Sequence, residues 1–348
     1  MKVSIRTWVS IATATLIVIL IVLSRKELVQ AWELLGQVDL RILALFVPLL
    51  IISNYAAAEM IFSYLKQNKL MTKIKPLSQL RISLEMNFAN HALPSGGVSG
   101  ASYIAWRLNK LGVPMSKTTI ALAVRFIVGF GAFLSLLAVA IIFVTIDGAI
   151  NRWIILVSAG IATLMIGASA AAIYFIHGED RIQVAAIWIT KAADFLTHKV
   201  TRGRRISKVK SQRIETYLLR VREDYIVLMQ NKQNLLKPFI WGIVFTLAEV
   251  AMFWVAFWAL GTQVNPAPIL IAYGVATIAG FVVLTPGGSG AYEALMVGFL
   301  AVAGIAQDIA IAGIVLTRVI ILMFVLSVGY VLYQLALIKY GKNDRTDF

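Results

Sequence analysis

The sequence predicts an all-α integral membrane protein with about six transmembrane helices and two re-entrant helical hairpins, arranged as two inverted-topology repeats. The first observation is composition, since 59% of the 348 residues are hydrophobic, 14% are charged and the mean hydropathy is +0.83. The second is a series of apolar runs long enough to cross a bilayer. The third is a pattern of Glu, a Pro-Gly break and Arg within apolar segments, which occurs twice along the chain.

The apolar runs match the length of about 20 residues that a helix needs to cross the hydrocarbon core. They cover residues 8–23, 42–65, 118–146, 153–176, 239–260 and 309–338. The first run follows basic residues, as the core of a signal peptide does, but Ser24-Arg25-Lys26 stands where small residues would mark a cleavage site. We therefore expect an uncleaved membrane anchor, followed by an interfacial helix at 25–38 on the outer face.

Two further segments, 77–108 and 269–303, are each divided near the centre by a Pro-Gly element. Each half has about 12 to 18 residues, too short to cross the bilayer but suited to a half-helix. The break residues are Pro94, Gly96, Gly97 and Gly100 in the first hairpin and Pro286, Gly287, Gly288 and Gly290 in the second. The first hairpin is also polar at depth, which lipid does not tolerate, so its polar residues are expected to face a protein-enclosed or water-filled cavity. These residues are Arg81, Glu85, Asn87, Asn90 and His91.

The repeated pattern keeps a nearly constant spacing, with Glu-to-Pro separations of 35 and 37 residues and Pro-to-Arg separations of 31 and 32 residues. Its recurrence in otherwise diverged sequence indicates an ancient duplication. Paired broken segments in two halves point to a transporter binding site near the bilayer midplane. The two copies are Glu59, Pro94 and Arg125, and Glu249, Pro286 and Arg318.

The basic residues indicate the orientation, because Lys and Arg in short loops favour the cytoplasmic side. With both termini cytoplasmic and each hairpin returning to its own side, the segment 177–238 lies inside with 13 Lys and Arg against six acidic residues. The first hairpin then opens inside and the second outside, so the two repeats run in opposite directions. The expected divisions are 1–38 for the anchor and interfacial helix, 39–176 for the first repeat, 177–238 for the cytoplasmic connection and 239–348 for the second repeat.

The cytoplasmic connection contains an expected amphipathic helix between residues 211 and 233, where apolar residues recur at helical spacing. Its basic run at 199–213 fits retention on the cytoplasmic side, and it could also bind anionic inner-leaflet headgroups at about 1 kcal/mol per residue. The net charge of +15 would suggest nucleic acid in a soluble domain. Here the charge lies between spans, so we expect lipid and no nucleic acid as partner.

Ionisable residues in the apolar segments are the candidate binding residues, since each such charge costs at least about 2.5 kcal/mol without a partner or a polar cavity. We expect Glu59 to pair with Arg125, and Glu249 with Arg318. Either these pairs fix helix register, or the arginines bind an anionic group while the acids balance charge or bind a coupling proton. Half-helix N-termini at the breaks would add partial positive charge. The expected substrate-binding set is Arg125, Arg318, Glu59, Glu249, Glu293, Glu85 and His91.

Metal and covalent chemistry have little support in the composition. The chain has no cysteine and three histidines, and no His-acid pair at a recognisable spacing accompanies the serines near the first break. We expect no catalytic site, metal or cofactor, and hence no enzyme.

The segment 284–293, Leu-Thr-Pro-Gly-Gly-Ser-Gly-Ala-Tyr-Glu, together with Arg318 in the last span, resembles the C-terminal signature of the flippase-like transmembrane domain of lysylphosphatidylglycerol synthases. The resemblance covers essentially the whole chain and includes Arg107, which joins the expected substrate-binding residues. It implies a bacterial or archaeal plasma-membrane protein that moves lipids or lipid-linked groups between leaflets. The chain departs from the family at Gly100-Ala101, where members carry a Gly-Glu pair. It also lacks the soluble aminoacyltransferase domain, so we expect a stand-alone protein rather than a synthase.

We therefore expect a lipid flippase or transporter that moves an anionic or zwitterionic phospholipid headgroup between leaflets by alternating access. Two alternatives stay open at this point. One is a non-transporting membrane partner of a lipid- or glycan-modifying enzyme, and the other is an ion or small-solute transporter. Glycines at 129 and 131 and at 160 and 167 are compatible with close helix contacts within one protomer or in a homo-oligomer.

Overall fold

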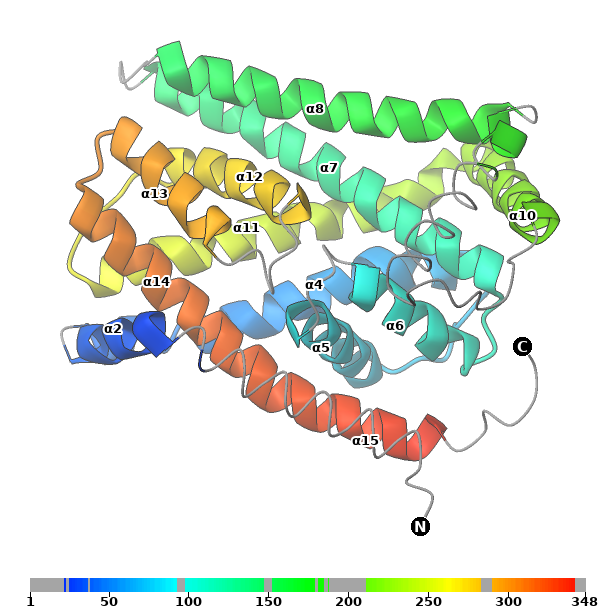
Figure 1. Ribbon diagram of the computed structural model, residues 1–348, viewed down its shortest axis with the longest axis horizontal. Helices are drawn as coiled ribbons and strands as arrows, with labels where there is room; N and C mark the ends of the chain where they lie inside the picture. The colour runs from blue at the N-terminus through cyan, green and yellow to red at the C-terminus, as the bar shows by residue number, and fades with distance from the viewer. Residues whose placement is uncertain are drawn as a thin grey trace, which may run out of the picture.

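The described part of the chain in the computed structural model is helical, with no strands in it. The structure describes residues 22, 25–36, 38–92, 98–146, 152–178, 181–184, 187, 211–282 and 290–341. In chain order the helices are α2 (Arg25–Leu35), α3 (Leu40–Leu43), α4 (Phe46–Gln67), α5 (Pro76–Ala92), α6 (Val98–Asn109), α7 (Met115–Ile146), α8 (Arg152–His177), α10 (Ser211–Gln230), η1 (Lys232–Leu235), α11 (Leu236–Ala259), α12 (Pro266–Val282), α13 (Ala291–Val302), α14 (Gln307–Phe324), the π-helical turn η3 (Val325–Gly329) and α15 (Tyr330–Tyr340). Helices α2 and α10 lie at opposite ends of the bundle (Figure 1).

Helical stretches long and apolar enough to cross a membrane occur where four of the six spans were predicted. These stretches are Leu40–Gln67, Met115–Phe143, Lys232–Ala259 and Gln307–Tyr340. The span predicted at 153–176 lies in α8, which contributes a shorter apolar helix at Leu156–Ala171. Apart from residue 22, the span predicted at 8–23 lies outside the described residues.

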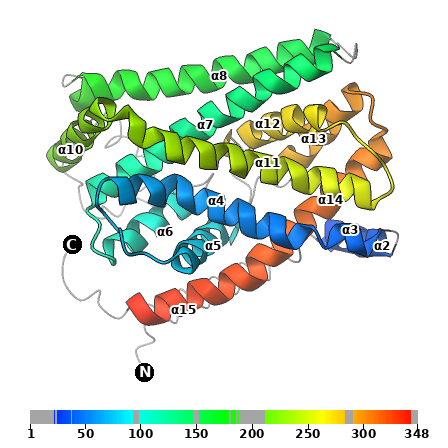
Figure 2. The same cartoon turned by 180° about the vertical axis from the view of Figure 1, so that it is seen from behind.

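Helices α4 and α11 lie side by side at the centre of the bundle and run in opposite directions (Figures 1 and 2). The backbone N–H of Asp39, before α3, donates to the carbonyl of Ala259 at the end of α11 over 2.9 Å. Helix α7 packs against both α4 and α11, and it comes close to α11 at Gly242. A Cβ there would lie 3.0 Å from the Ala132 Cβ and 3.3 Å from the Val128 carbonyl oxygen, so glycine permits this close approach.

A pair of short helices flanks each of the two breaks. Helix α5 packs against α6, and α12 packs against α13. The α5–α6 pair lies toward the end of the bundle that holds α10, and the α12–α13 pair lies toward the end that holds α2 (Figures 1 and 2). Among the expected break residues only Gly100 and Gly290 belong to the described part of the chain. Gly290 precedes α13 with a φ of +91°, a conformation that glycine adopts without strain.

Each pair of short helices also contacts a long helical segment of the other half. Helix α12 packs against α7, where a Cβ at Gly274 would lie 2.2 Å from the Phe133 ring. Helix α5 packs against η3 and α15, where a Cβ at Gly329 would lie 2.9 Å from the Phe88 Cβ and 3.1 Å from the Leu84 carbonyl oxygen. Glycine at 329 therefore permits a close approach to the backbone of α5, and glycine at 274 makes room for the ring of Phe133.

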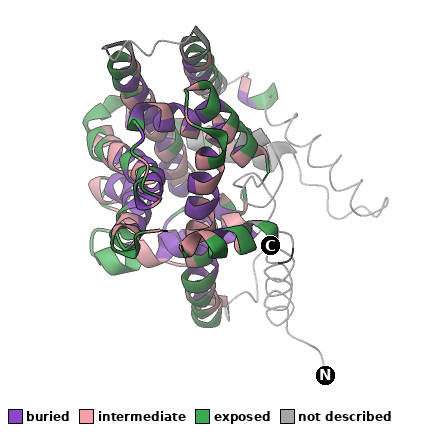
Figure 3. Ribbon diagram, turned by 90° about the vertical axis from the view of Figure 1, so that its left-hand side faces the viewer, coloured by how far each residue is buried: buried purple, intermediate pink, exposed green. Residues whose placement is uncertain are grey.

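Buried residues face the interior of the bundle and exposed residues form its outer surface (Figure 3). The amphipathic helix predicted between residues 211 and 233 is confirmed as α10, which contacts α7 and α8. Tyr225 and Leu228 of α10 are buried in the core, while Ile226 and Val227 are exposed. Burial raises the pKa of the Tyr225 hydroxyl above its ordinary value, because the ionised form loses hydration. The connection is therefore docked on the bundle through one face of α10.

Candidate functional site

Glu59 on α4 is neutralised within its own helix. The Lys66 Nζ lies 2.8 Å from Glu59 Oε1, and the Tyr55 hydroxyl donates to the same oxygen over 3.1 Å. The predicted pair of Glu59 with Arg125 is wrong. Lys66, seven residues further along the helix, reaches back to the acid, whereas Arg125 on α7 points its Nη1 at the Met86 sulfur 3.0 Å away.

Glu85 on α5 is the centre of a buried network that joins three helices. Its side chain has no exposed surface, and Oε1 accepts from Arg81 Nε over 2.8 Å. Oε2 accepts from the Tyr103 hydroxyl over 2.8 Å and from Arg107 Nε over 3.2 Å. The Arg107 guanidinium carbon lies 3.8 Å from the centre of the Tyr340 ring on α15. Both carboxylate oxygens are occupied by protein, so this geometry favours a structural role.

The remaining polar side chains of α5 also make hydrogen bonds within the protein. Asn87 donates to Asn54 Oδ1 on α4 over 2.6 Å, and His91 Nδ1 lies 2.9 Å from the Asn87 carbonyl oxygen. Asn90 Oδ1 accepts from the backbone N–H of Gly100 in the first turn of α6 over 2.8 Å. That N–H was expected to attract an anion, but it is already satisfied by a side chain.

Arg318 on α14 pairs with Glu293 on α13, not with Glu249 as predicted. Its Nε lies 2.9 Å from Glu293 Oε1, and its guanidinium carbon lies 4.3 Å from the centre of the Tyr292 ring. The other Glu293 oxygen accepts from the backbone N–H of Gly290 over 2.6 Å. Glu293 thus caps the start of α13 and presents its second oxygen to Arg318, which explains why this acid is the partner.

Glu249 on α11 is bonded to the opposite half of the bundle, because its Oε1 accepts from the Ser53 hydroxyl on α4. The charge of Arg318 acts on Glu249, and Tyr273 on α12 interacts electrostatically with Glu249 and Arg318. Tyr273 also interacts electrostatically with Arg125. We refer to Arg125, Glu249, Tyr273, Glu293 and Arg318 as the central cluster. His91 also interacts electrostatically with Arg318.

Arg125 differs from the other arginines discussed above because no carboxylate in the described residues forms an ion pair with it. It stands ten residues into α7, about 15 Å along the helix axis at 1.5 Å per residue. Its recorded contact is the Met86 sulfur, a weak acceptor, although a guanidinium has five N–H donors. The side chain is only partly buried. The Arg125 guanidinium, which lies deep in the bundle, therefore has N–H groups that can donate to an anion.

Sequence reasoning missed Lys66, Tyr103 and Ser53 as partners of the buried acids. Lys66 left a usable signal, since residues seven apart share a helix face and a lysine can extend along it. Arg81 and Glu85 likewise stand at i and i+4. Ser53 left none, because its contact with Glu249 depends on how α4 and α11 are rotated against each other.

Residues 7–329 match the protein family described as the lysylphosphatidylglycerol synthase TM region. The chain is also 22% identical over 254 residues to a UPF0104 membrane protein of the archaeon Methanothermobacter thermautotrophicus, an alignment that covers 72% of each chain. No solved structure matches it.

Proposed function

The chain belongs to the lysylphosphatidylglycerol synthase TM-region family, and from this premise we propose that it moves the headgroup of an anionic or zwitterionic phospholipid between leaflets. The acyl tails would stay in the bilayer while the headgroup crosses through the central cluster. The proposed partner is membrane lipid, and the proposed activity is transport without catalysis.

The observation that carries the proposal is the Arg125 guanidinium, at depth in α7 and without a carboxylate partner in the described residues. A positive charge in such a place costs free energy that a bound anion would offset. The planar guanidinium donates two parallel hydrogen bonds to a phosphate, which suits a phospholipid headgroup.

The arrangement of the short helices supports alternating access. The α5–α6 and α12–α13 pairs lie toward opposite ends of the bundle, and each contacts a long helix of the other half. This is the pattern expected of re-entrant hairpins in two inverted repeats. A shift of one pair against its partner helix would open one end of the bundle while the other stays closed.

The acids of the central cluster could couple lipid movement to the binding of a proton. Glu293 and Arg318 neutralise each other, while Glu249 faces Ser53. With both acids ionised, Arg125 and Arg318 balance Glu249 and Glu293, so an arriving anionic headgroup adds one net negative charge. We propose that protonation of Glu249 restores neutrality when the headgroup binds, which couples lipid movement to protons.

The test is headgroup translocation in proteoliposomes with labelled phosphatidylglycerol, its aminoacylated form and a polyprenyl-phosphate lipid. Arg125→Gln should slow translocation by at least about tenfold, the effect of one lost charge-assisted contact. Arg125→Lys should fall between that variant and the wild type, because it keeps the charge and loses the planar fork. The matched control is Arg220→Gln, which removes an exposed charge on α10 and should leave the rate unchanged.

The outcomes separate the candidate functions. Wild-type protein that moves none of the three lipids would contradict the proposal. A change in conductance or solute uptake on Arg125→Gln, with lipid unmoved, would indicate an ion or small-solute transporter. A soluble transferase that co-purifies in fixed ratio, again with lipid unmoved, would indicate a membrane partner of a modifying enzyme.

A further inference from the structure

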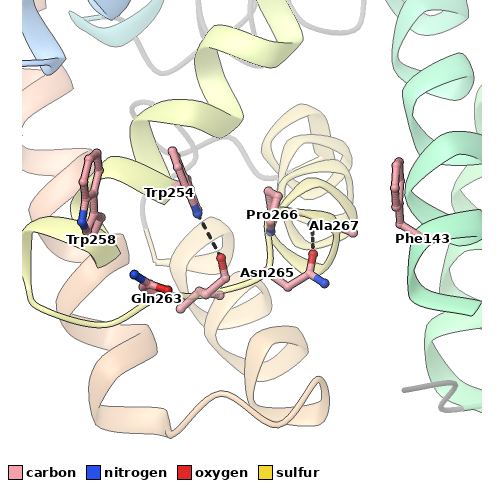
Figure 4. Close-up of a pocket in the computed structure, with 8 residues that line it drawn as sticks. Phe143, Trp254, Trp258, Gln263, Asn265, Pro266 and Ala267 are labelled. Atoms are coloured by element: carbon pink, nitrogen blue, oxygen red, sulfur yellow. Dashed lines mark hydrogen bonds between the residues drawn. The ribbon is translucent and has the colours of Figure 1, made fainter. Parts of the chain in front are cut away.

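Two pockets at opposite ends of α11 differ in their chemistry. The first, of about 670 Å³, lies where α11 leads into α12 and is walled by Trp254, Trp258 and Phe143 (Figure 4). Its polar groups serve the loop itself, since the Trp254 indole donates to the Val264 carbonyl over 3.0 Å and Asn265 Oδ1 accepts from the backbone N–H of Ala267 over 2.9 Å. Of these two pockets, the first has no charged residue in its lining and the second has three.

The second pocket, of about 550 Å³, is lined by residues of α4 and α11 near η1, at the end of the bundle that the charge distribution predicts to be cytoplasmic. It extends to Glu59, eight residues before the end of α4 and thus about 12 Å along the helix. We call it the inner pocket. Its polar and aromatic lining is Glu59, Ser63, Lys66, Gln67, Lys237 and Trp241.

The inner pocket is lined by two lysines and one acid, so its lining carries one net positive charge. Lys66 is paired with Glu59 on α4, and Lys237 projects from α11 on the other wall. Lys237 makes no ion pair with any residue that the structure describes. A lysine ammonium on each wall can bind one phosphate from two sides, with Glu59 holding Lys66 in place.

An unused acceptor lies beside these cations. Gln67 Oε1 is buried and has no hydrogen-bond partner within the described chain. Buried polar atoms are rarely left unpaired, so this oxygen favours a ligand that donates a hydrogen bond. A phosphodiester has no hydrogen-bond donor of its own at neutral pH. A hydroxyl group on the esterified headgroup alcohol can supply that donor. The lining therefore selects a phosphodiester that carries a hydroxylated headgroup.

The aromatic wall suits the apolar part of the same ligand. Trp241 packs edge-on against Tyr55, with ring centroids 5.4 Å apart and an interplanar angle of 86°. Tyr55 in turn donates to Glu59, so the wall and the charged pair form one assembly. A tryptophan at the mouth of an interfacial pocket fits the boundary between headgroup and acyl chains.

The two lysines of the inner pocket have no counterpart at the matching positions of the other half. The offset of 190 residues that relates Glu59 to Glu249 places Ala256 at the position of Lys66 and Val47 at the position of Lys237. The duplicated framework thus carries a pair of lysines at one end only. Such asymmetry is expected of a site that serves one leaflet.

We infer that the inner pocket binds the headgroup of an anionic, hydroxylated glycerophospholipid from the adjacent leaflet, with its phosphate between Lys66 and Lys237 and its hydroxyl on Gln67. This site is separate from the central cluster. Binding at it can be measured without translocation, so the inference fails or stands independently of the proposed transport.

The experiment titrates the detergent-purified full chain with dihexanoylphosphatidylglycerol and measures the dissociation constant by calorimetry. Parallel titrations use dihexanoylphosphatidylcholine, which is zwitterionic, and glycerol 1-phosphate, which supplies phosphate without a lipid. The variant is Lys237→Gln. Its matched control is Lys232→Gln, which removes an exposed lysine of η1 that does not line the pocket. Thermal unfolding confirms that each variant is folded.

Phosphatidylglycerol should bind more tightly than either comparison ligand. Lys237→Gln should weaken it by about tenfold or more, as the loss of a charge-assisted hydrogen bond requires, and Lys232→Gln by less than about twofold, as for a screened surface charge. Gln67→Leu should weaken phosphatidylglycerol but not dihexanoylphosphatidylmethanol, a phosphodiester that lacks the hydroxyl. Equal binding of glycerol 1-phosphate, equal effects of the two lysine variants, or no binding of phosphatidylglycerol would each overturn the inference.

Discussion

Glu85→Gln should destabilise the protein more than any other single change of a carboxylate to its amide discussed here. The substitution keeps the size and shape of the side chain and removes one negative charge from a position with no exposed surface. Arg107 would then be left with 5% of its side chain exposed and no ionic partner, and its Nη1 already has no hydrogen-bond partner in the described structure. Arg81 is one-third exposed, so solvent would screen its share of the loss.

The expected magnitude follows from the more deeply buried pair. Removing one partner of a buried ion pair costs about 3–5 kcal/mol, because the other charge is left uncompensated. The loss of the Tyr103 hydrogen bond is small, since the amide oxygen of Gln can still accept it. We therefore expect Glu85→Gln to lower the free energy of unfolding by about 3 kcal/mol or more.

The assay is reversible unfolding in mixed detergent micelles, followed by circular dichroism. The control is Glu223→Gln on the exposed face of α10, which should change the free energy of unfolding by less than about 0.5 kcal/mol. A double variant, Glu85→Leu with Arg107→Leu, should recover part of the loss because no buried charge remains unpaired. A loss below about 1 kcal/mol for Glu85→Gln, or a double variant less stable than the single one, would refute the reasoning.

Two further predictions concern the contacts between the halves of the bundle, and both use the same unfolding assay. Gly329→Ala should cost about 1–3 kcal/mol because its Cβ would meet the backbone of α5; Gly298→Ala, which meets open space in α13, should instead stabilise by about 0.5–1 kcal/mol, and equal effects would count against the close approach. Ser53→Ala should cost about 1.5–3 kcal/mol if Glu249 is ionised. The exposed Ser327→Ala should change stability by less than about 0.5 kcal/mol, and a matching loss there would remove the special role of Ser53.

Much of the helical framework could be predicted from the sequence because it depends on local properties. Apolar length located the four described long spans, and the Pro-Gly breaks separated α5 from α6 and α12 from α13. The ion pairs could not be predicted in the same way, since they depend on the rotation of each helix about its axis. Matching Glu59 with Arg125 by symmetry ignored Lys66 on the same helix face and the thioether of Met86 facing the arginine. The break residues 94–97 and 286–288 lie outside the described chain, so their role stays a prediction.

The two halves of the chain carry different charged residues at matching positions. Gly100-Ala101 and Gly290-Ala291 align at the offset of 190 residues, which places Tyr103 at the position of Glu293. In the second half Glu293 caps its helix and forms an ion pair with Arg318 of α14, whereas in the first half the Tyr103 hydroxyl donates to Glu85.

The arginine of α7, Arg125, therefore has no acid from its own hairpin. The acid of α11, Glu249, has Ala256 where Glu59 has Lys66, and so it has no lysine on its own helix. Neither Arg125 nor Glu249 has the charged partner that its counterpart in the other half has, and both interact electrostatically with Tyr273. The two halves thus differ by a cation on α7 that has no carboxylate partner among the described residues and an acid on α11 that has no lysine on its own helix, and both helices pack against α12. The proposed coupling of an anionic headgroup to a proton would use these two groups.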